Sequence, residues 1–92
     1  MQIIELKQAI NINGKEVKEV TLDFDKLNGE DFIAAEKEVR QLGDTSPTVF
    51  LSMRYQAVIA AKLVGVPVED LYKINGTDFK NIIMLVANFL LV

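Results

Sequence analysis

The first quarter of the chain alternates between apolar and polar positions with a period of two, which is typical of β-strands. Its regularly spaced apolar residues share the even positions: Ile4, Leu6, Ile10, Ile12, Val20, Leu22 and Phe24. Residues 3–12 and 17–24 are therefore predicted to be two strands. Asn13-Gly14 lies between them and is a strong signal for a hairpin turn.

The register of this hairpin is constrained by the shared parity. A two-residue Asn13-Gly14 loop would pair even positions with odd ones and send Leu22 to the face opposite Ile4. A loop of odd length or a bulge restores the match. We therefore predict a three-residue loop or a bulge that uses Gly14, with Val17 off the apolar face.

From residue 28 onward the apolar spacing changes to three and four, which predicts helices. Asn28 can cap a helix whose first turn carries Glu30 and Asp31. Gly43 is suited to end this helix. One buried stripe is expected along it: Phe32, Ala35, Val39 and Leu42.

A second helix is predicted to follow the cap and first-turn proline at Ser46-Pro47 and to end at Gly65. Its apolar stripe comprises Phe50, Met53, Ala57, Ala60, Ala61 and Val64. Pro67 then opens a short helix over residues 68–73. A last helix, capped by Asn75 or Thr77, runs towards the C-terminus. Residues 27–32 and 74–79 resemble one another, which we interpret as two similar helix caps.

These elements predict an α+β fold in one domain, residues 1–92. An N-terminal β-hairpin over residues 1–25 precedes a small helical bundle over residues 28–92, with three main helices and one short helix. A hairpin alone is marginal in water, so this one is expected to pack on the helices or to pair with another chain.

The last helix is apolar around most of its circumference. Between residues 79 and 92 only Lys80, Asn81 and Asn88 are polar, and they fall within an arc of about 100°. Such a helix is either central to the core or covered by a partner, and both interpretations stay open. The candidate partner-binding residues are Ile82, Ile83, Val86, Phe89 and Leu90, together with Phe50 and Met53 of the preceding long helix.

Composition restricts the chemistry available to this chain. The protein has no Cys and no His, which excludes disulfides, thiol chemistry, zinc sites built on these residues and a histidine base. The acidic pairs Asp23/Asp25, Glu30/Asp31 and Glu69/Asp70 fit a strand end and two helix first turns, where acids are favoured. We predict no catalytic, cofactor-binding or metal-binding residue, and therefore no enzyme.

Charge and hydropathy bear on the partners. The net charge is −3, and neither half of the chain is basic enough to indicate nucleic-acid binding. The apolar stretch at residues 79–92 is too short to span a bilayer, and the N-terminus has no signal-peptide pattern. We expect a cytoplasmic protein that is not secreted. Residues 57–71 resemble a helix-turn-helix, but Glu69 and Asp70 stand where a DNA-reading helix needs donors or cations.

The ordered set of motifs resembles the phage tail assembly chaperones, the small tail-assembly proteins of P2-like and Mu-like phages. The resemblance rests on segments in a fixed order: Asn13-Gly14-Lys15, Val17–Leu22, Leu27–Asp31, Ala35-Glu36, Tyr55, Ala60-Ala61-Lys62, Gly65–Leu71, Asp78-Phe79 and Phe89-Leu90. The chain departs from the family at Ile74–Thr77, where a Leu-Pro often precedes the Asp-Phe.

The resemblance implies a non-enzymatic viral protein of a phage or prophage, working in the host cytoplasm. It would bind the tape measure protein and keep it soluble while the tail tube assembles, with the tube subunit as a second candidate partner. A homo-oligomer is left open. The alternatives are a minor structural tail component, such as an adaptor or capping subunit, and a small DNA-binding regulator.

Overall fold

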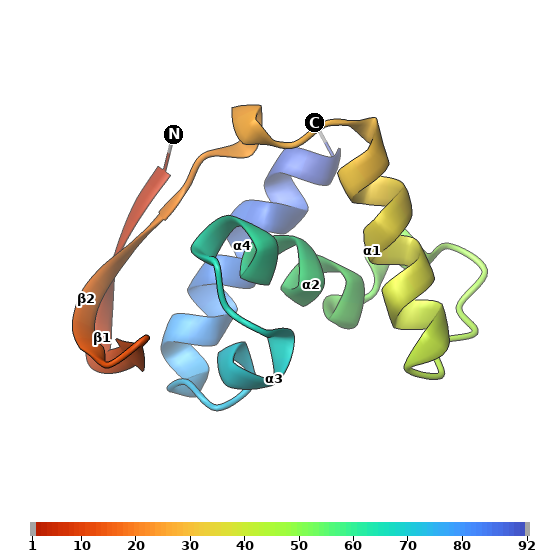
Figure 1. Cartoon of the computed structure of the whole chain (residues 1–92). Coiled ribbons are helices and arrows are strands. Elements are labelled where there is room, and N and C mark those ends of the chain that lie inside the picture. Colours follow the sequence, from red (N-terminus) through yellow and green to blue (C-terminus); the bar gives the residue numbers. More distant parts are fainter. Residues whose placement is uncertain (1, 92) are drawn as a thin grey trace.

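The computed structural model describes residues 2–91. The strands β1 (Gln2–Ile12) and β2 (Lys15–Leu22) form an antiparallel hairpin. Four helices follow: α1 (Gly29–Gln41), α2 (Met53–Val64), α3 (Val68–Leu71) and α4 (Gly76–Leu91). The hairpin and α1 lie at opposite ends of the molecule, with α2 and α4 between them (Figure 1). The predicted α+β arrangement, with three main helices and one short helix, is confirmed.

The irregularity that brings the apolar residues of both strands to one face lies inside β1 and not in the turn. The loop has only two residues, Asn13 and Gly14, with φ angles of 53° and 83°, and Ile12 pairs directly with Lys15. Positive φ at both positions is the geometry of a type I′ turn. The predicted longer loop is therefore wrong.

The register changes between two regular stretches of the ladder. Near the open end Ile4 pairs with Val20, whereas near the turn Ile10 pairs with Val17. Residues 6–9 of β1 bulge out opposite Lys18 alone. The extra residues turn Ile10 and Val17 to the side that packs against the core. The prediction that Val17 lies off this face is also wrong.

A buried carboxylate holds this bulge against the start of α4. Asp78 is fully buried, and its two oxygens accept the backbone N–H of Lys7 at 2.8 and 3.0 Å. One of these oxygens also accepts the N–H of Gln8 at 3.1 Å. The bulge leaves these amides without ladder partners, and they satisfy the carboxylate of Asp78, which would be costly to bury without hydrogen bonds.

Helix α2 begins later than the sequence indicates. Ser52, and not Ser46, caps it by accepting the N–H of Tyr55 at 3.1 Å. The Ser46 carbonyl instead accepts a hydrogen bond from Arg40 at 2.7 Å, so this segment is tied to the end of α1. Hydrogen bonds from the Ser46 side chain and backbone lower the pKa of the Asp44 carboxyl next to it. Phe50 and Met53 consequently leave the buried stripe.

Helix α2 is the centre of the core. It packs against α1, α4 and β2, and every residue from Tyr55 to Ala61 is buried. The small residues Ala57, Ala60 and Ala61 allow these close approaches. The Tyr55 hydroxyl donates to the Phe32 carbonyl of α1 at 3.2 Å. Burial raises the pKa of this phenol, and nearby Glu36 adds to the effect.

The predicted helix ends hold with small changes. Asn28 and Asp31 form a capping box on α1, and Gly65 ends α2 with φ 88°. Asn75, and not Thr77, caps α4, accepting the N–H groups of Thr77 and Asp78. Helix α3 is shorter than predicted and ends at Leu71.

Candidate partner-binding surface

The apolar circumference of α4 is mostly explained by the core. Ile82 and Val86 are 0% exposed and Ile83 is 7% exposed, so these three residues lie inside the molecule. The hairpin covers α4 on one side and α2 covers it on another. In this structure these three candidate residues are therefore core residues, and they offer no surface to a partner.

The end of α4 is engaged within the chain. The ring of Phe89 stacks on Phe24 with centroids 4.3 Å apart and planes inclined by 7°. It also lies 6.3 Å from the ring of Phe32 in α1. Leu90 is half-buried against the core. Phe89 is nevertheless 40% exposed, so part of its ring remains at the surface.

Phe50 and Met53 are exposed, at 40% and 61%, and among the candidates in α4 Phe89 is exposed to the same degree as Phe50, at 40%. Leu51 between them is 52% exposed, and Tyr72, after α3, is 44% exposed. Large apolar side chains scattered singly on a surface need no explanation, whereas a group of them indicates an interaction site.

A shallow apolar hollow brings together two of these side chains, Met53 and Tyr72, at the junction of α2, α3 and α4. Its lining consists of Met53, Arg54, Tyr72, Ile74, Gly76 and Phe79, and we call it the apolar hollow. The Tyr72 and Phe79 rings meet edge to face with centroids 6.3 Å apart. The two rings form a rigid apolar surface, which suits the capture of an aliphatic or aromatic side chain.

Charged groups surround the apolar hollow unevenly. Arg54 is the cation in its lining, and among residues 2–91 its guanidinium donates a single long hydrogen bond, at 3.5 Å, to the Leu42 carbonyl. Burial raises the pKa of the Tyr72 phenol, Arg54 opposes that shift, and Glu69 and Glu38 add to it. The arginine is therefore available to an acidic group on a bound partner.

Sequence reasoning found Met53 but missed Tyr72, Ile74 and Phe79. Tyr72 and Ile74 lie in the connection between α3 and α4, where helical periodicity assigns no core position. An apolar residue in such a connection was the signal that could have identified them. Phe79 was not singled out because it belongs to the continuous apolar stretch of α4.

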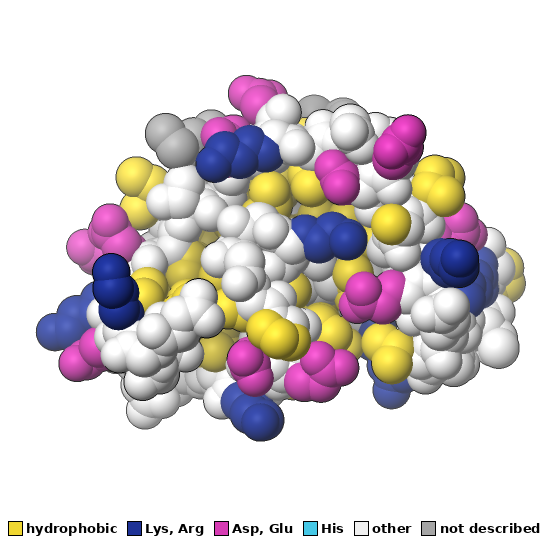
Figure 2. All heavy atoms as spheres, viewed as in Figure 1, with side chains coloured by type: hydrophobic (Ala, Val, Ile, Leu, Met, Phe, Trp, Pro, Cys, Tyr) yellow, Lys and Arg dark blue, Asp and Glu magenta, His cyan; other side chains and the backbone are white. Residues whose placement is uncertain are grey.

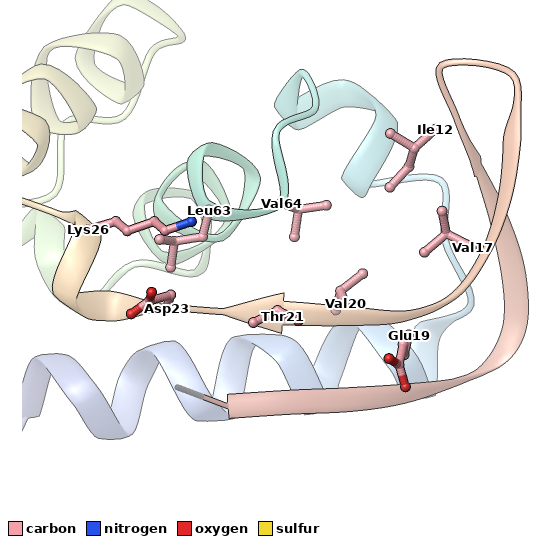
Figure 3. Close-up of a pocket in the computed structure, with 9 residues that line it drawn as sticks. All are labelled: Ile12, Val17, Glu19, Val20, Thr21, Asp23, Lys26, Leu63 and Val64. Carbon is pink, nitrogen blue, oxygen red and sulfur yellow. The ribbon is translucent and has the colours of Figure 1, made fainter.

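A second concavity runs between β2 and the end of α2 (Figure 3). Val17 and Val20 of β2 form one side and Leu63 and Val64 of α2 form the other, with Ile12 near the turn. Three consecutive residues, Glu19 to Thr21, line it. Side chains of successive strand residues point to opposite faces, so the concavity reaches the edge of the strand. On the face shown in Figure 2, hydrophobic side chains are visible across the middle of the molecule, with charged side chains between and around them.

The acidic residues do not form a metal centre within residues 2–91, where no group of three or more potential ligands comes together. No helix in that range is long and apolar enough to cross a membrane. Helix α3 is a single turn with exposed Glu69 and Asp70, which is unlike a helix that reads DNA.

Comparison with protein-family models decides the family. Residues 3–91 match the model described as phage tail assembly chaperone proteins, E, or 41 or 14. The chain belongs to this family. Comparison with curated proteins and with solved structures gave no significant match.

Membership assigns the protein a chaperone role in phage tail assembly. Chaperones of this kind interact with tail proteins, and the family indicates a non-enzymatic role. The match also covers the hairpin and all four helices. The elements that form the apolar hollow are therefore part of the family fold.

Proposed function

We propose that this chaperone binds the tape measure protein in the host cytoplasm and keeps it soluble while tube subunits polymerise around it. A tape measure must remain extended and unaggregated until the tube encloses it. Its apolar helix faces need a temporary cover at that stage. Such a task requires apolar surface and reversible binding, and no catalytic group.

The observation that carries this proposal is the apolar hollow, together with the exposed side chains beside it in sequence. Tyr72 and Phe79 supply rigid aromatic surface, and Met53 adds a flexible thioether that adapts to different shapes. An amphipathic helix recognised in this way inserts one or two apolar anchors into a groove. We expect an acidic residue near such an anchor, opposite Arg54.

The shallowness of the hollow fits a temporary complex. Interfaces that form and dissolve during assembly are smaller and more exposed than permanent ones. Several chaperone copies along one tape measure would each bind weakly and be displaced by tube subunits. The tube subunit itself is a second candidate partner.

Co-expression with the tape measure protein of the same phage tests the proposal. We expect a soluble complex on size-exclusion chromatography with light scattering, and an insoluble tape measure when it is expressed alone. A chaperone that never associates with a tape measure that is soluble unaided would contradict the proposal. Retention of the protein in purified tails would favour a structural tail component.

A matched pair of variants locates the binding surface. Met53→Glu places a charge in the apolar hollow, at the first position of α2, where an acid suits the helix dipole. Met84→Glu places the same charge on the exposed side of α4, at a methionine with 55% exposure against 61% for Met53. We expect Met53→Glu to lose the complex and Met84→Glu to keep it. Equal binding by both variants would move the site away from the hollow.

A further inference from the structure

The outer edge of β2 has no strand beside it. The sheet of the described chain has two strands in the order β1-β2, so one edge of β2 presents unpaired backbone groups. An open edge of this kind is a template for another strand. Residues 15–19 near the turn are exposed except for the half-buried Val17.

The charges of β2 find no complementary partners in β1. Lys15 stands opposite Ile12 and Glu16 opposite Asn11, while Glu19 faces another acid, Glu5. Lys18 lies opposite the bulge and has no single partner. Like charges directly opposite one another are unfavourable in a sheet. Among residues 2–91 the salt bridge that forms is between Arg40 and Glu36 of α1.

These charges are complementary to their own reversed order. The segment reads Lys15-Glu16-Val17-Lys18-Glu19, so an antiparallel copy centred on Val17 places Lys15 opposite Glu19 and Glu16 opposite Lys18. A shift of one residue in either direction would put Glu16 opposite Glu19, or Lys15 opposite Lys18. The pattern therefore selects a single register among these neighbours.

We propose that two copies of the chain associate through antiparallel pairing of their β2 strands about a two-fold axis at Val17. The two hairpins then form one four-stranded sheet with opposite charges in the four pairs that flank the central Val17–Val17 pair. An interface of this kind is self-complementary, as two-fold symmetry requires. It also relieves the marginal stability of a two-stranded sheet.

The surroundings of β2 favour a second copy and limit the length of the pairing. Val20 and Leu22 are buried, at 4% and 0% exposure, so the far end of β2 is occupied by the core. The concavity in Figure 3 continues from the open edge towards Leu63 and Val64. A partner strand along the edge covers part of this apolar surface, in addition to the backbone pairing.

Charge reversal and its compensation test the proposal with the intact chain. The molar mass and dissociation constant are measured by sedimentation equilibrium and light scattering. Lys18→Glu places acid opposite acid at two symmetry-related positions, and we expect dimerisation to weaken by about tenfold or more. The double variant Lys18→Glu with Glu16→Lys restores both pairs and should recover the wild-type constant. Lys37→Glu, on the exposed side of α1, is the control and should leave it unchanged.

A mixing experiment provides a second measurement. The variant Lys15→Glu with Lys18→Glu has four acids in the segment, and the variant Glu16→Lys with Glu19→Lys has four bases. Each should be monomeric alone, and the mixture should form a heterodimer. Circular dichroism confirms that each variant is folded.

Three outcomes overturn the proposal. The first is a wild-type chain that is monomeric at about 1 mM. The second is a folded Lys18→Glu variant that dimerises as the wild type does. The third is a folded pair of complementary variants that do not associate. The inference is independent of the tape measure, so its failure leaves the proposed function in place.

Discussion

Helices α1 and α4 begin with the same motif, Asn-Gly-x-Asp-Phe, at residues 28–32 and 75–79. In both, the asparagine side chain caps the helix and accepts the N–H of the aspartate. The glycine is the first helical residue in both. The aspartate that follows, however, has a different role in each helix.

In α1 the interaction is local. Asp31 turns back and accepts the N–H of Asn28 at 2.9 Å, which completes a solvent-exposed capping box. In α4 the corresponding Asp78 is fully buried and accepts N–H groups of Lys7 and Gln8, about seventy residues earlier in the chain. An aspartate three positions after the capping asparagine therefore completes a local cap in α1 and links the hairpin to the helix in α4.

The comparison shows that the energetic weight of a residue depends on what else it satisfies. An exposed cap competes with water, so its loss is partly replaced by solvent. A buried carboxylate that satisfies backbone N–H groups has no such substitute.

The largest effect is expected from Asp78→Ala, which removes the buried carboxylate that accepts the Lys7 and Gln8 amides of the β1 bulge. We predict a loss of about 3 kcal/mol in the free energy of unfolding. The matched change Asp31→Ala removes only the local capping box and should cost about 1 kcal/mol. Urea unfolding followed by circular dichroism gives both values. Equal losses would mean that the hairpin anchor contributes no more than a cap.

An intermediate and equal effect is expected from the two capping asparagines. Asn28→Ala and Asn75→Ala should each cost about 1 kcal/mol, because each removes the acceptor of its own helix start. Serine at either position should recover most of the loss. A much larger loss at Asn75 would indicate that this cap also orients Asp78, which can be checked by thermal denaturation of Asn75→Ala in an Asp78→Ala background.

The smallest effect is expected from the two glycines, and it has the opposite sign. A Cβ at Gly29 or Gly76 meets no atom within 4 Å, and neither glycine has a positive φ. Alanine at either position should stabilise the protein by about 0.5 kcal/mol, mainly by restricting the unfolded chain. Gly65→Ala is the control and should destabilise, because Gly65 has φ +88°. Differential scanning calorimetry resolves these changes in melting temperature. If alanine destabilises the protein at Gly76 and not at Gly29, the first turns of α4 and α1 are not equivalent.

The local motifs were predictable because their physics acts over a few residues. Asn28 as a cap, Gly65 as a helix end and Asn13-Gly14 as a turn all follow from residue preferences that hold in any fold. The order of elements from the hairpin to α4 follows from apolar periodicity. The shared even positions of the apolar residues in both strands also indicated that the hairpin needs a bulge or a loop of odd length.

The long-range arrangement was not predictable in the same way. The bulge appeared in β1 and not in the turn, because Asp78 of α4 offers acceptors for its amides. The segment from Ser46 to Leu51 did not join α2: Arg40 of α1 binds the Ser46 carbonyl, and Val49–Leu51 forms a separate 3-10 helix. These contacts depend on residues brought together only when the chain has folded.

The candidate partner-binding residues show the same difference between local pattern and tertiary packing. From apolar periodicity alone, Ile82 and Val86 were as good candidates as Phe50 and Met53, since periodicity identifies an apolar face but not what covers it. The packing of the hairpin and α2 on α4 buries the first pair, and the late start of α2 exposes the second.

Local sequence was enough to place the cap at Asn28, the helix end at Gly65, the position of the hairpin turn, the order of the elements and the self-complementary charges of β2, since each depends on neighbouring residues or on strand spacing. Only the tertiary structure decided where the bulge falls, what Asp78 binds and which apolar residues remain exposed. The physical reason is that burial and long-range hydrogen bonding are properties of the packed chain, and the local pattern is compatible with more than one packing.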